Sequence, residues 1–227
     1  LGSIPCPASS DRYADVQEIG RGGMSTIREV FDKNLNRAVA MKLLDSDRTD
    51  DRVERQRFIE EAQIMGQLEH PGIVPVHDLG QDESGSPFMC MTLLRGETLE
   101  KRVDSLGLTR LDPENLTELL GVFSKVCEAI GFAHSRGVFH RDLKPTNVML
   151  AEFGQVYVLD WGLAKFSREA SSVSEDGDRP PVQVSRPTDA TITQPGVTLG
   201  SPNFMSPEQV HHEPERLDHR TDIFGLG

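Results

Sequence analysis

The chain has 227 residues, of which 37% are hydrophobic and 26% charged, and its formal net charge at pH 7 is −12. This length allows one large domain or two small lobes with a sizeable core. The acidic balance argues against a nucleic-acid-binding surface and a polybasic membrane patch, although a few local cations can still bind a phosphorylated ligand. No apolar run approaches the length of a membrane span.

The three cysteines Cys6, Cys90 and Cys127 are far apart, and no CxxC pair occurs. A disulfide framework or a cysteine metal site is therefore not expected, and a reducing compartment fits best. The first residues lack the charged and apolar regions of a signal peptide, so we interpret residues 1–12 as a tail or as the edge of a longer chain. We expect a cytoplasmic protein, with membrane tethering beyond residue 227 left open.

Residues 13–94 are predicted to form strands and one helix. The extended segments are YADVQEIG, STIREVF, RAVAMKLL, IVPVHDL and PFMCMTLL. A helix is predicted from Arg52 to Leu68, and the sequence His70-Pro71-Gly72 follows it as a stop. Its apolar stripe consists of Phe58, Ala62, Met65 and Leu68. The segment RGET after the last strand is interpreted as a connector.

The segment IGRGGMSTI contains three glycines, at positions 20, 22 and 23. A plain turn is one interpretation, because a lone glycine cluster is a weak signal. A dinucleotide-binding loop is disfavoured, because the residues after the glycines are strand-like and Lys42 lies where an acidic residue is expected. The alternative is a hairpin whose glycine tip brings backbone N–H groups close to phosphate oxygens, with Lys42 on the following strand as countercharge.

Beyond residue 94 the pattern becomes helical. Asp112 and Pro113 are suited to the N-cap and first position of a helix, and Gly137 to its C-terminal end. Apolar or aromatic residues at helical spacing between them are Leu116, Leu120, Phe123, Cys127, Ile130 and His134. Short apolar segments GVFH, VMLA and VYVLD follow, and LDHRTDIFGLG is predicted to begin another helix. Residues 167–197 are rich in Ser, Pro, Thr and Asp, which predicts a long disordered insertion.

The segment HRDLKPTN, residues 140–147, concentrates polar chemistry between two apolar segments. Asp142 can accept a proton from a hydroxyl, Lys144 can neutralise a phosphoryl group, and Asn147 can donate to Asp142 or ligate a metal. The alternative is a polar turn that joins a helix to a strand. In VLDWGLAK, Asp160 is either a metal-binding carboxylate at a strand end or a solvated neighbour of a core tryptophan.

Five ordered motifs together carry a family resemblance: GRGGMS, VAMK, HRDLKPTN, DWG and SPE. Over residues 13–227 the chain resembles the eukaryotic-type (Hanks-type) Ser/Thr protein kinases, in particular their bacterial branch. The resemblance implies an α+β, two-lobe protein kinase fold. Residues 13–94 would form the N-lobe, an antiparallel sheet plus helix C, and residues 95–227 a mainly helical C-lobe that is incomplete at its C-terminus. Residues 160–208 would be the activation segment, including the insertion 167–197.

The resemblance implies ATP as the nucleotide. Lys42 would pair with its α and β phosphates and with Glu61. Ile27 and Ala40 would cover the adenine on one side and Met149 on the other. Met91 would be the gatekeeper, with backbone groups of the residues after it bonding the adenine edge. The nucleotide-contacting set is Ile19, Gly20, Gly22, Gly23, Ser25, Ile27, Ala40, Lys42, Met91, Thr92, Leu94 and Met149.

The resemblance also implies the reacting groups. Asp142 would orient the substrate hydroxyl and accept its proton, and Asn147 and Asp160 would hold Mg²⁺. Lys144 is typical of Ser/Thr-type members, and Ser201 matches a threonine that helps to select hydroxyl substrates. The implied catalytic set is Asp142, Lys144, Asn147, Lys42, Glu61 and Ser201.

Two further implications concern packing and control. Trp161, which replaces the usual phenylalanine of this motif, would pack inward in a column with His140, Met65 and Val76. A phosphate on the long loop would pair with Arg141 and Lys165. The favoured acceptors are Thr191, Thr193 and Thr198, with a solvated linker as the alternative.

We therefore expect a Mg²⁺- and ATP-dependent kinase that phosphorylates Ser or Thr of proteins, with self-association for autophosphorylation and no nucleic-acid partner. A nucleotide-binding pseudokinase and a small-molecule phosphotransferase are the alternatives. Because the sequence stops at Gly227, we expect C-lobe helices to be missing and a large apolar surface to be exposed. Either the sequence is a fragment of a longer protein, or it is not a competent enzyme alone.

Overall fold

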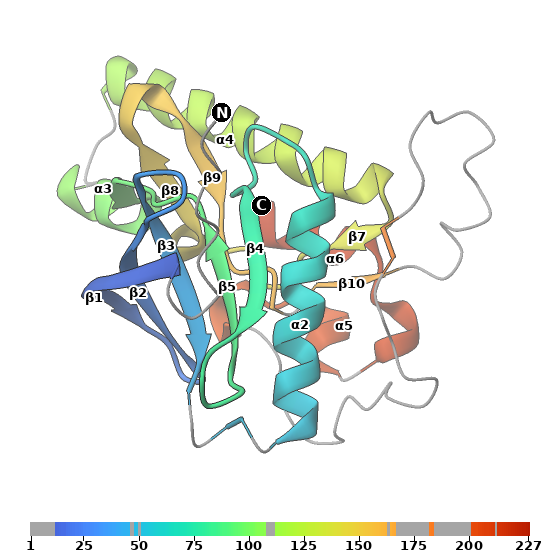
Figure 1. Cartoon of the computed structure of the whole chain (residues 1–227). Helices are drawn as coiled ribbons and strands as arrows, with labels where there is room; N and C mark the ends of the chain where they lie inside the picture. The colour runs from blue at the N-terminus through green and yellow to red at the C-terminus, as the bar shows by residue number, and fades with distance from the viewer. Residues whose placement is uncertain are drawn as a thin grey trace. The chain divides into compact units, whose positions relative to one another are not determined.

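The computed structural model describes residues 12–45, 48–49, 51–107, 112–162, 164–166, 182–183, 201–211 and 213–227. Its internal contacts divide the chain into two units, of which the first comprises Leu1–Gly66 and Pro75–Leu94 and the second Gln67–Val74 and Arg95–Gly227. Figure 1 shows their helices and strands. The segment 67–74 joins the second unit because Gly72 O accepts a hydrogen bond from Val158 N (2.8 Å) and Ile73 forms a parallel bridge with Val158.

The first unit is built on a five-stranded antiparallel sheet with the strand order β1-β2-β3-β5-β4. Every strand coincides with a segment that was predicted to be extended. The strands are β1 (Tyr13–Arg21), β2 (Ser25–Asp32), β3 (Arg37–Leu44), β4 (Val76–Gln81) and β5 (Pro87–Met91). Gly20 lies near the end of β1, and Gly22 and Gly23 lie in the β1–β2 turn, so the predicted hairpin itself is confirmed.

Alternation along the strands gives this sheet two chemically different faces. One face carries the buried cluster Val30, Val39, Met41, Phe88 and Cys90. The branched and aromatic side chains of this cluster pack across strands, and their burial drives sheet formation. The opposite face therefore receives the alternate residues, among them Lys42 and its cross-strand neighbour Ile27.

The helix α2 (Arg52–Gln67) confirms the predicted helix to within one residue. Asp51 caps it, since its carboxylate accepts a hydrogen bond from Val53 N (2.8 Å). The whole predicted stripe, Phe58, Ala62, Met65 and Leu68, is buried. Glu61 is the one charged residue buried in this helix, and α2 lies beside the sheet in Figure 1.

The second unit contains a small three-stranded antiparallel sheet, β6 (Gly96–Thr98), β8 (Val148–Ala151) and β9 (Val156–Val158), in the order β6-β8-β9. The prediction of RGET as a connector was wrong, because Gly96–Thr98 pairs with β8. Glycine makes this long-range pairing possible: Gly96 has φ 152°, and a Cβ at this position would lie 2.0 Å from Leu150 O. Only glycine allows the two backbones to approach this closely.

The helices and short elements of the second unit follow in chain order. The helices are α3 (Leu99–Ser105), α4 (Pro113–Ser135), α5 (Pro207–Val210) and α6 (His219–Leu226). The strand β7 (Val138–Phe139) pairs with β10 (Lys165–Phe166). Short 3-10 turns span Pro145–Asn147, Glu152–Gly154, Pro202–Phe204 and Pro214–Arg216.

The helix α4 begins as predicted, since Asp112 accepts from Asn115 N (2.8 Å) and Pro113 occupies the first turn. Its buried face is shifted from the predicted stripe and consists of Val122, Val126, Ala129, Ile130 and Ala133. Leu116, Leu120 and Phe123 are exposed, as are Ile223 and Phe224 of α6. These individual exposures do not by themselves define the large apolar surface that was expected, which stays a prediction. In the part of the chain that the structure describes, no helix combines the length and apolar character that crossing a bilayer requires.

Candidate functional site

An ion pair links β3 to α2 in the first unit. Lys42 Nζ lies 2.6 Å from Glu61 Oε1 and 2.8 Å from Oε2. The side chains are only 14% and 7% exposed, so both charges are largely removed from water. Lys42 Nζ also lies 5.9 Å from the ring centroid of Phe58. The structure thus contains the expected pairing of Lys42 with Glu61, and it holds the ammonium group at a fixed place on the sheet.

The sheet register groups the candidate nucleotide residues of the first unit on one face. Ile27 lies opposite Lys42, Gly20 opposite Ile27, and Ala40 opposite Met91. Because cross-strand partners point to the same side, these side chains line the face that is turned away from the buried cluster. Ile19, next to Gly20, is exposed.

The glycine-rich turn is closed by a hydrogen bond from Gly22 N to Ser25 O (2.8 Å). A Cβ added at Gly23 would meet nothing within 4 Å, and one at Gly22 would meet only Ser25 at ordinary contact distances. Neither residue has a positive φ. The fold itself therefore does not require glycine at these two positions, and their backbone stays uncovered by side chains.

The segment after β5 contributes backbone groups. Thr92 N donates to Pro75 O (3.0 Å), and Thr92 Oγ1 lies 3.2 Å from His77 Nε2. The N–H of Thr92 is therefore already used, which leaves its carbonyl as the backbone group for a ligand. Leu94 is half-buried. In the second unit, Met149 lies on β8 between Thr98 of β6 and Tyr157 of β9, and it is half-buried.

A polar network surrounds Asp142 in the second unit. Its Oδ2 accepts from Lys144 Nζ (2.6 Å), and its Oδ1 accepts from Ser201 N (3.0 Å). Lys144 Nζ also contacts Ser201 Oγ (2.7 Å). Asn147 Nδ2 donates to Asp142 O (2.9 Å) and lies 3.3 Å from Oδ2. Three predicted site residues of the loop 140–147, together with Ser201 from a distant segment, thus meet at the buried carboxylate of Asp142.

Asp160 lies close to this network along the backbone. Leu159 N donates to Asn147 O (2.8 Å), so the residue before Asp160 is paired with Asn147. Asp160 is exposed and has φ 58°, an unusual backbone conformation for a residue other than glycine. Trp161 is 0% exposed, and its ring centroid lies 4.7 Å from that of His140. The inward position of Trp161 and its contact with His140 are confirmed.

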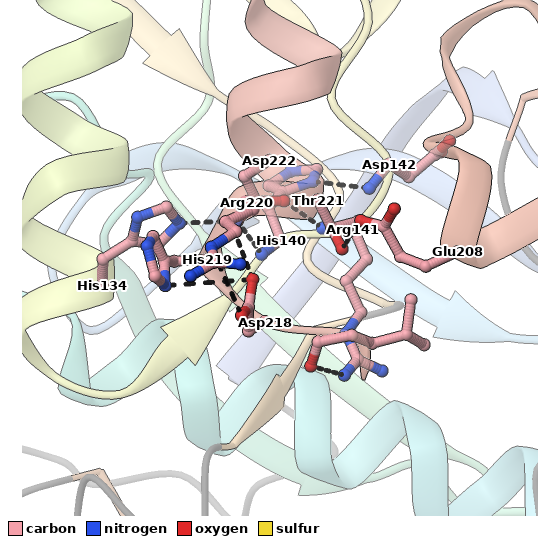
Figure 2. Close-up of polar contacts among 11 residues, drawn as sticks. His134, His140, Arg141, Asp142, Glu208, Asp218, His219, Arg220, Thr221 and Asp222 are labelled. Carbon is pink, nitrogen blue, oxygen red and sulfur yellow. Dashed lines mark hydrogen bonds and ion pairs between the residues drawn. The ribbon is translucent and has the colours of Figure 1, made fainter. Parts of the chain in front are cut away.

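Sequence reasoning assigned no role to Asp222, which organises the loop before Asp142. Its carboxylate accepts from His140 N (2.8 Å) and Arg141 N (2.6 Å), and it lies 2.7 Å from His134 Nε2. Figure 2 shows these contacts converging from α4, α6 and the loop. The segment DHRTDIFGLG, which contains Asp222, resembles the start of a helix in the kinase family, but this resemblance does not reveal what the carboxylate contacts.

The burial of Asp222 would by itself raise the pKa of its carboxyl group. The hydrogen bond with His134, the nearby His140 and the two backbone N–H groups outweigh this effect and lower the pKa below its usual value. The carboxylate therefore stays charged at neutral pH. A charged acceptor makes stronger hydrogen bonds than a neutral one, so the backbone of residues 140 and 141 is held firmly.

Arg141 directly precedes Asp142, and its backbone N–H donates to Asp222. Its φ is 70°. Burial lowers the pKa of its guanidinium group to about 10, although the charge of Asp222 acts in the opposite direction. Arg141 Nη2 contacts Leu217 O at 3.4 Å, while the buried Nε has no hydrogen-bond partner among the described residues. The Arg141 carbonyl accepts from Gln209 Nε2 (2.7 Å). A buried cation without a full set of acceptors is suited to binding an anion.

The neighbouring helix α5 is fixed by Glu208. Its Oε1 accepts from Thr221 Oγ1 (2.8 Å), a contact also drawn in Figure 2. Thr221 directly precedes Asp222 in α6. The same turn of α6 therefore contacts both α5, through Glu208, and the loop before Asp142, through Asp222. The proposed phosphate acceptors Thr191, Thr193 and Thr198 lie outside the described residues, as does the side chain of Lys165.

An open pocket of about 650 Å³ lies elsewhere in the second unit. It is lined by residues of β6, α3, α4, β8, β9 and the turn between β8 and β9. None of the predicted site residues lines it. The pocket is therefore separate from the network around Asp142.

Comparisons with known proteins agree with this geometry. The sequence model of the protein kinase domain matches residues 13–227. The serine/threonine-protein kinase PknD of Chlamydia felis (strain Fe/C-56) is 35% identical over 222 residues, which are 95% of this chain and 23% of that protein. PknD of Protochlamydia amoebophila (strain UWE25) is 34% identical over 232 residues, 99% of this chain and 23% of that protein. The chain thus spans about a quarter of the length of these curated relatives.

Proposed function

Since this chain belongs to the protein kinase domain family, we propose that it is the kinase domain of a protein that phosphorylates serine or threonine. The reaction moves the γ-phosphoryl group of ATP to a Ser or Thr hydroxyl of a protein substrate. Members of this family generally use ATP with Mg²⁺. The proposal assigns the cytoplasm as the location, no nucleic acid as a partner, and self-association for autophosphorylation.

In the first unit, Lys42 is proposed to bind the α and β phosphates. The support is its ion pair with Glu61, which fixes the ammonium group on the sheet face shared with Ile27 and Ala40. Ile27 and Ala40 are the proposed adenine contacts of this unit, together with Ile19 and the backbone carbonyl of Thr92. The proposed gatekeeper Met91 lies opposite Ala40 in the register.

The glycine-rich turn is proposed to cover the phosphates with its backbone N–H groups. Gly20, Gly22 and Gly23 leave the turn without side chains, and Ser25 still provides an N–H donor. The support is the absence of any steric need for glycine at 22 and 23 within the fold. Close approach of a ligand to the backbone would explain why glycine occurs at positions 22 and 23, which packing within the fold does not explain.

Asn147 and Asp160 are the proposed metal ligands, and their donor atoms fit Mg²⁺. Toward the described part of the chain, the Asn147 amide makes its hydrogen bonds through its nitrogen, so its oxygen can face a cation. The Asp160 carboxylate is exposed and follows the residue paired with Asn147. Carboxylate and amide oxygens suit a hard divalent ion. When bound, Mg²⁺ neutralises developing charge on the phosphate oxygens.

Asp142 is proposed to orient the substrate hydroxyl and accept its proton. Lys144 and the N–H of Ser201 hold the carboxylate in place. Lys144 also brings a positive charge to the site of phosphoryl transfer, where it stabilises the transition state. Ser201 is tied to Lys144 through its hydroxyl, which joins the segment after the insertion to the catalytic loop.

The observation that carries this proposal is the joint coordination of the Asp142 carboxylate by Lys144 and Ser201. These contacts connect two segments that are far apart in the sequence, and they place a base, a cation and a hydroxyl within hydrogen-bonding reach of each other. A polar turn with no catalytic role has no need for this arrangement.

The test is transfer of labelled γ-phosphate from Mg-ATP to a generic basic protein and to the chain itself, followed by phosphoamino-acid analysis. We expect label on serine and threonine. In Asp142→Asn the rate should fall by at least roughly 10²–10⁴-fold, the contribution attributed to general acid–base catalysis. The exposed Asp104→Asn is the matched control and should keep the wild-type rate. Transfer by Asp142→Asn at the wild-type rate would refute the assigned role.

Phosphorylation within residues 167–198 is part of the same proposal. Arg141 supports it, because Nε of its half-buried guanidinium has no hydrogen-bond partner within the described residues and is suited to an anion. Thr191, Thr193 and Thr198 are the proposed acceptors. Phosphopeptide mapping after incubation with Mg-ATP should find phosphate in this range, and mapping that finds none would contradict the proposal.

A further inference from the structure

A paired contact connects the long insertion to the end of α2. Gln183 is one of two described residues in the range 167–200. Its backbone O accepts from Gln67 Nε2 (2.6 Å), and its backbone N donates to Gln67 Oε1 (3.0 Å). The side-chain amide of Gln67 therefore engages both backbone groups of one residue, as a neighbouring strand would. Both residues belong to the second unit.

The neighbouring residue adds burial to this contact. Val182 is only 6% exposed, although it lies in a segment that is otherwise rich in polar residues and proline. Burying a branched apolar side chain is favourable, and a pair of aligned hydrogen bonds next to it fixes the direction of the backbone. Val182 is buried and Gln183 is hydrogen-bonded through both of its backbone groups. Neither property is expected of residues in a solvated linker.

We propose that Val182–Gln183 is an anchor of the segment 160–208, and that Gln67 is the positioning residue that receives it. Gln67 is the last residue of α2, the helix that carries Glu61. The anchor lies between Asp160 and Ser201 in the sequence. A fixed point between two positions of a chain lowers the entropy cost of placing both of them, because each closure then spans fewer residues.

The anchor coexists with the polar network of its own unit and does not oppose it. In the second unit Ser201 is bound to both Asp142 and Lys144 while the anchor is formed. We therefore expect loss of the anchor to lower phosphoryl transfer. This part of the inference rests on the proposed kinase function.

Hydrogen exchange tests the contact without any need for activity. In Gln67→Met, which removes donor and acceptor, we expect backbone exchange at Val182–Gln183 to become roughly tenfold faster, in keeping with the modest net strength of two hydrogen bonds. Gln183→Ala is the matched control. It keeps the backbone groups that Gln67 contacts, so its exchange should match the wild type. Unchanged exchange in Gln67→Met would overturn the anchor whether or not the chain is a kinase.

A double-mutant cycle then tests the effect on transfer. Gln183→Pro removes the backbone N–H, and Gln67→Met removes its acceptor. Each should lower the rate of phosphoryl transfer several-fold, and the double variant should be no slower than the slower single variant, because all remove the same contact. Multiplicative effects would show that the residues act independently and would overturn the pairing. Faster transfer in either single variant would overturn the supporting role.

Discussion

The two units place their candidate site residues by different physical means. In the first unit, Ile27, Ala40 and Lys42 share a face because antiparallel register decides which side chains align. In the second unit, Asp142 lies in a loop with little regular structure, and Asp222 from a distant helix holds the backbone before it. Regular structure thus positions one half of the chemistry, and long-range polar contacts position the other half.

This contrast predicts unequal sensitivity to substitution. In the sheet, a side chain is positioned by many backbone hydrogen bonds, so that no single side chain is indispensable for placement. In the loop, one carboxylate satisfies two backbone N–H groups and a histidine, so a single change removes several contacts together. The largest effect is therefore expected at Asp222 and the smallest at the glycine-rich turn.

Asp222→Asn should cause the largest loss of stability among these variants. The amide replaces one of the two oxygens by an NH2 group, so either His140 N–H or Arg141 N–H faces a donor and loses its acceptor. The loss of the charged acceptor and one unsatisfied buried donor should lower the free energy of unfolding by about 3 kcal/mol. Urea denaturation measures this change. Asp218→Asn is the control, because asparagine serves equally well at the helix N-cap. Equal urea midpoints for Asp222→Asn and Asp218→Asn would contradict the claim that a single carboxylate holds the loop of the second unit.

The pH dependence of the same residue gives an independent check. Because the pKa of Asp222 is lowered in the folded chain, its stabilisation is fully present above the usual carboxyl value of about 3.9. The stabilisation is lost as the pH falls through the lower folded value. The stability difference between wild type and Asp222→Asn should therefore be constant near neutral pH and shrink below about pH 4. A difference that grows on acidification would contradict this sign.

Lys42→Met should have an intermediate effect on stability and abolish transfer. It leaves the Glu61 carboxylate largely buried without its partner, which should cost about 2 kcal/mol, since the lysine itself is at the edge of the buried region. The double variant Lys42→Met/Glu61→Gln should recover part of this loss, because it no longer buries an unpaired charge. Additive losses in thermal denaturation would show that the pair is not coupled.

Gly23→Ala should have the smallest effect on stability, within about 1 kcal/mol, because a Cβ at this position meets nothing. The Michaelis constant for ATP should nevertheless rise, since the methyl group occupies space proposed for phosphate. Gly96→Ala is the contrasting glycine. Its φ of 152° and the 2.0 Å approach to Leu150 O predict clear destabilisation. An unchanged ATP constant in Gly23→Ala would contradict the proposed role of the turn.

The sequence predicted the first unit almost completely, because strand alternation and helical spacing are local signals. The strands from Tyr13 to Met91 and the stripe of α2 were placed correctly. The prediction was wrong where a backbone partner decided the structure, as for Gly96–Thr98, which becomes a strand by pairing with β8. It also misplaced the buried face of α4, because spacing alone does not reveal which side of an apolar helix meets a partner.

The candidate site shows the same division. The residues of the loop 140–147 carried their chemistry in a short segment and were identified from it. Asp222 and Gln67 contribute through contacts with residues far away in the sequence, and the local helical patterns that contain them do not reveal these contacts. Positioning residues of this kind become visible only when the folded chain brings their partners together.

The most direct test of the central claim is to measure ATP affinity and phosphoryl transfer on the same preparation of Asp142→Asn beside the wild type. The account predicts that Asp142→Asn binds ATP with the same affinity as the wild type, because Asp142 acts on the substrate hydroxyl and not on nucleotide binding. Phosphoryl transfer should be present in the wild type and lost in the variant. If the full-length protein that contains this chain also binds ATP but transfers no phosphate, it is a nucleotide-binding pseudokinase, and the catalytic role of Asp142 is contradicted.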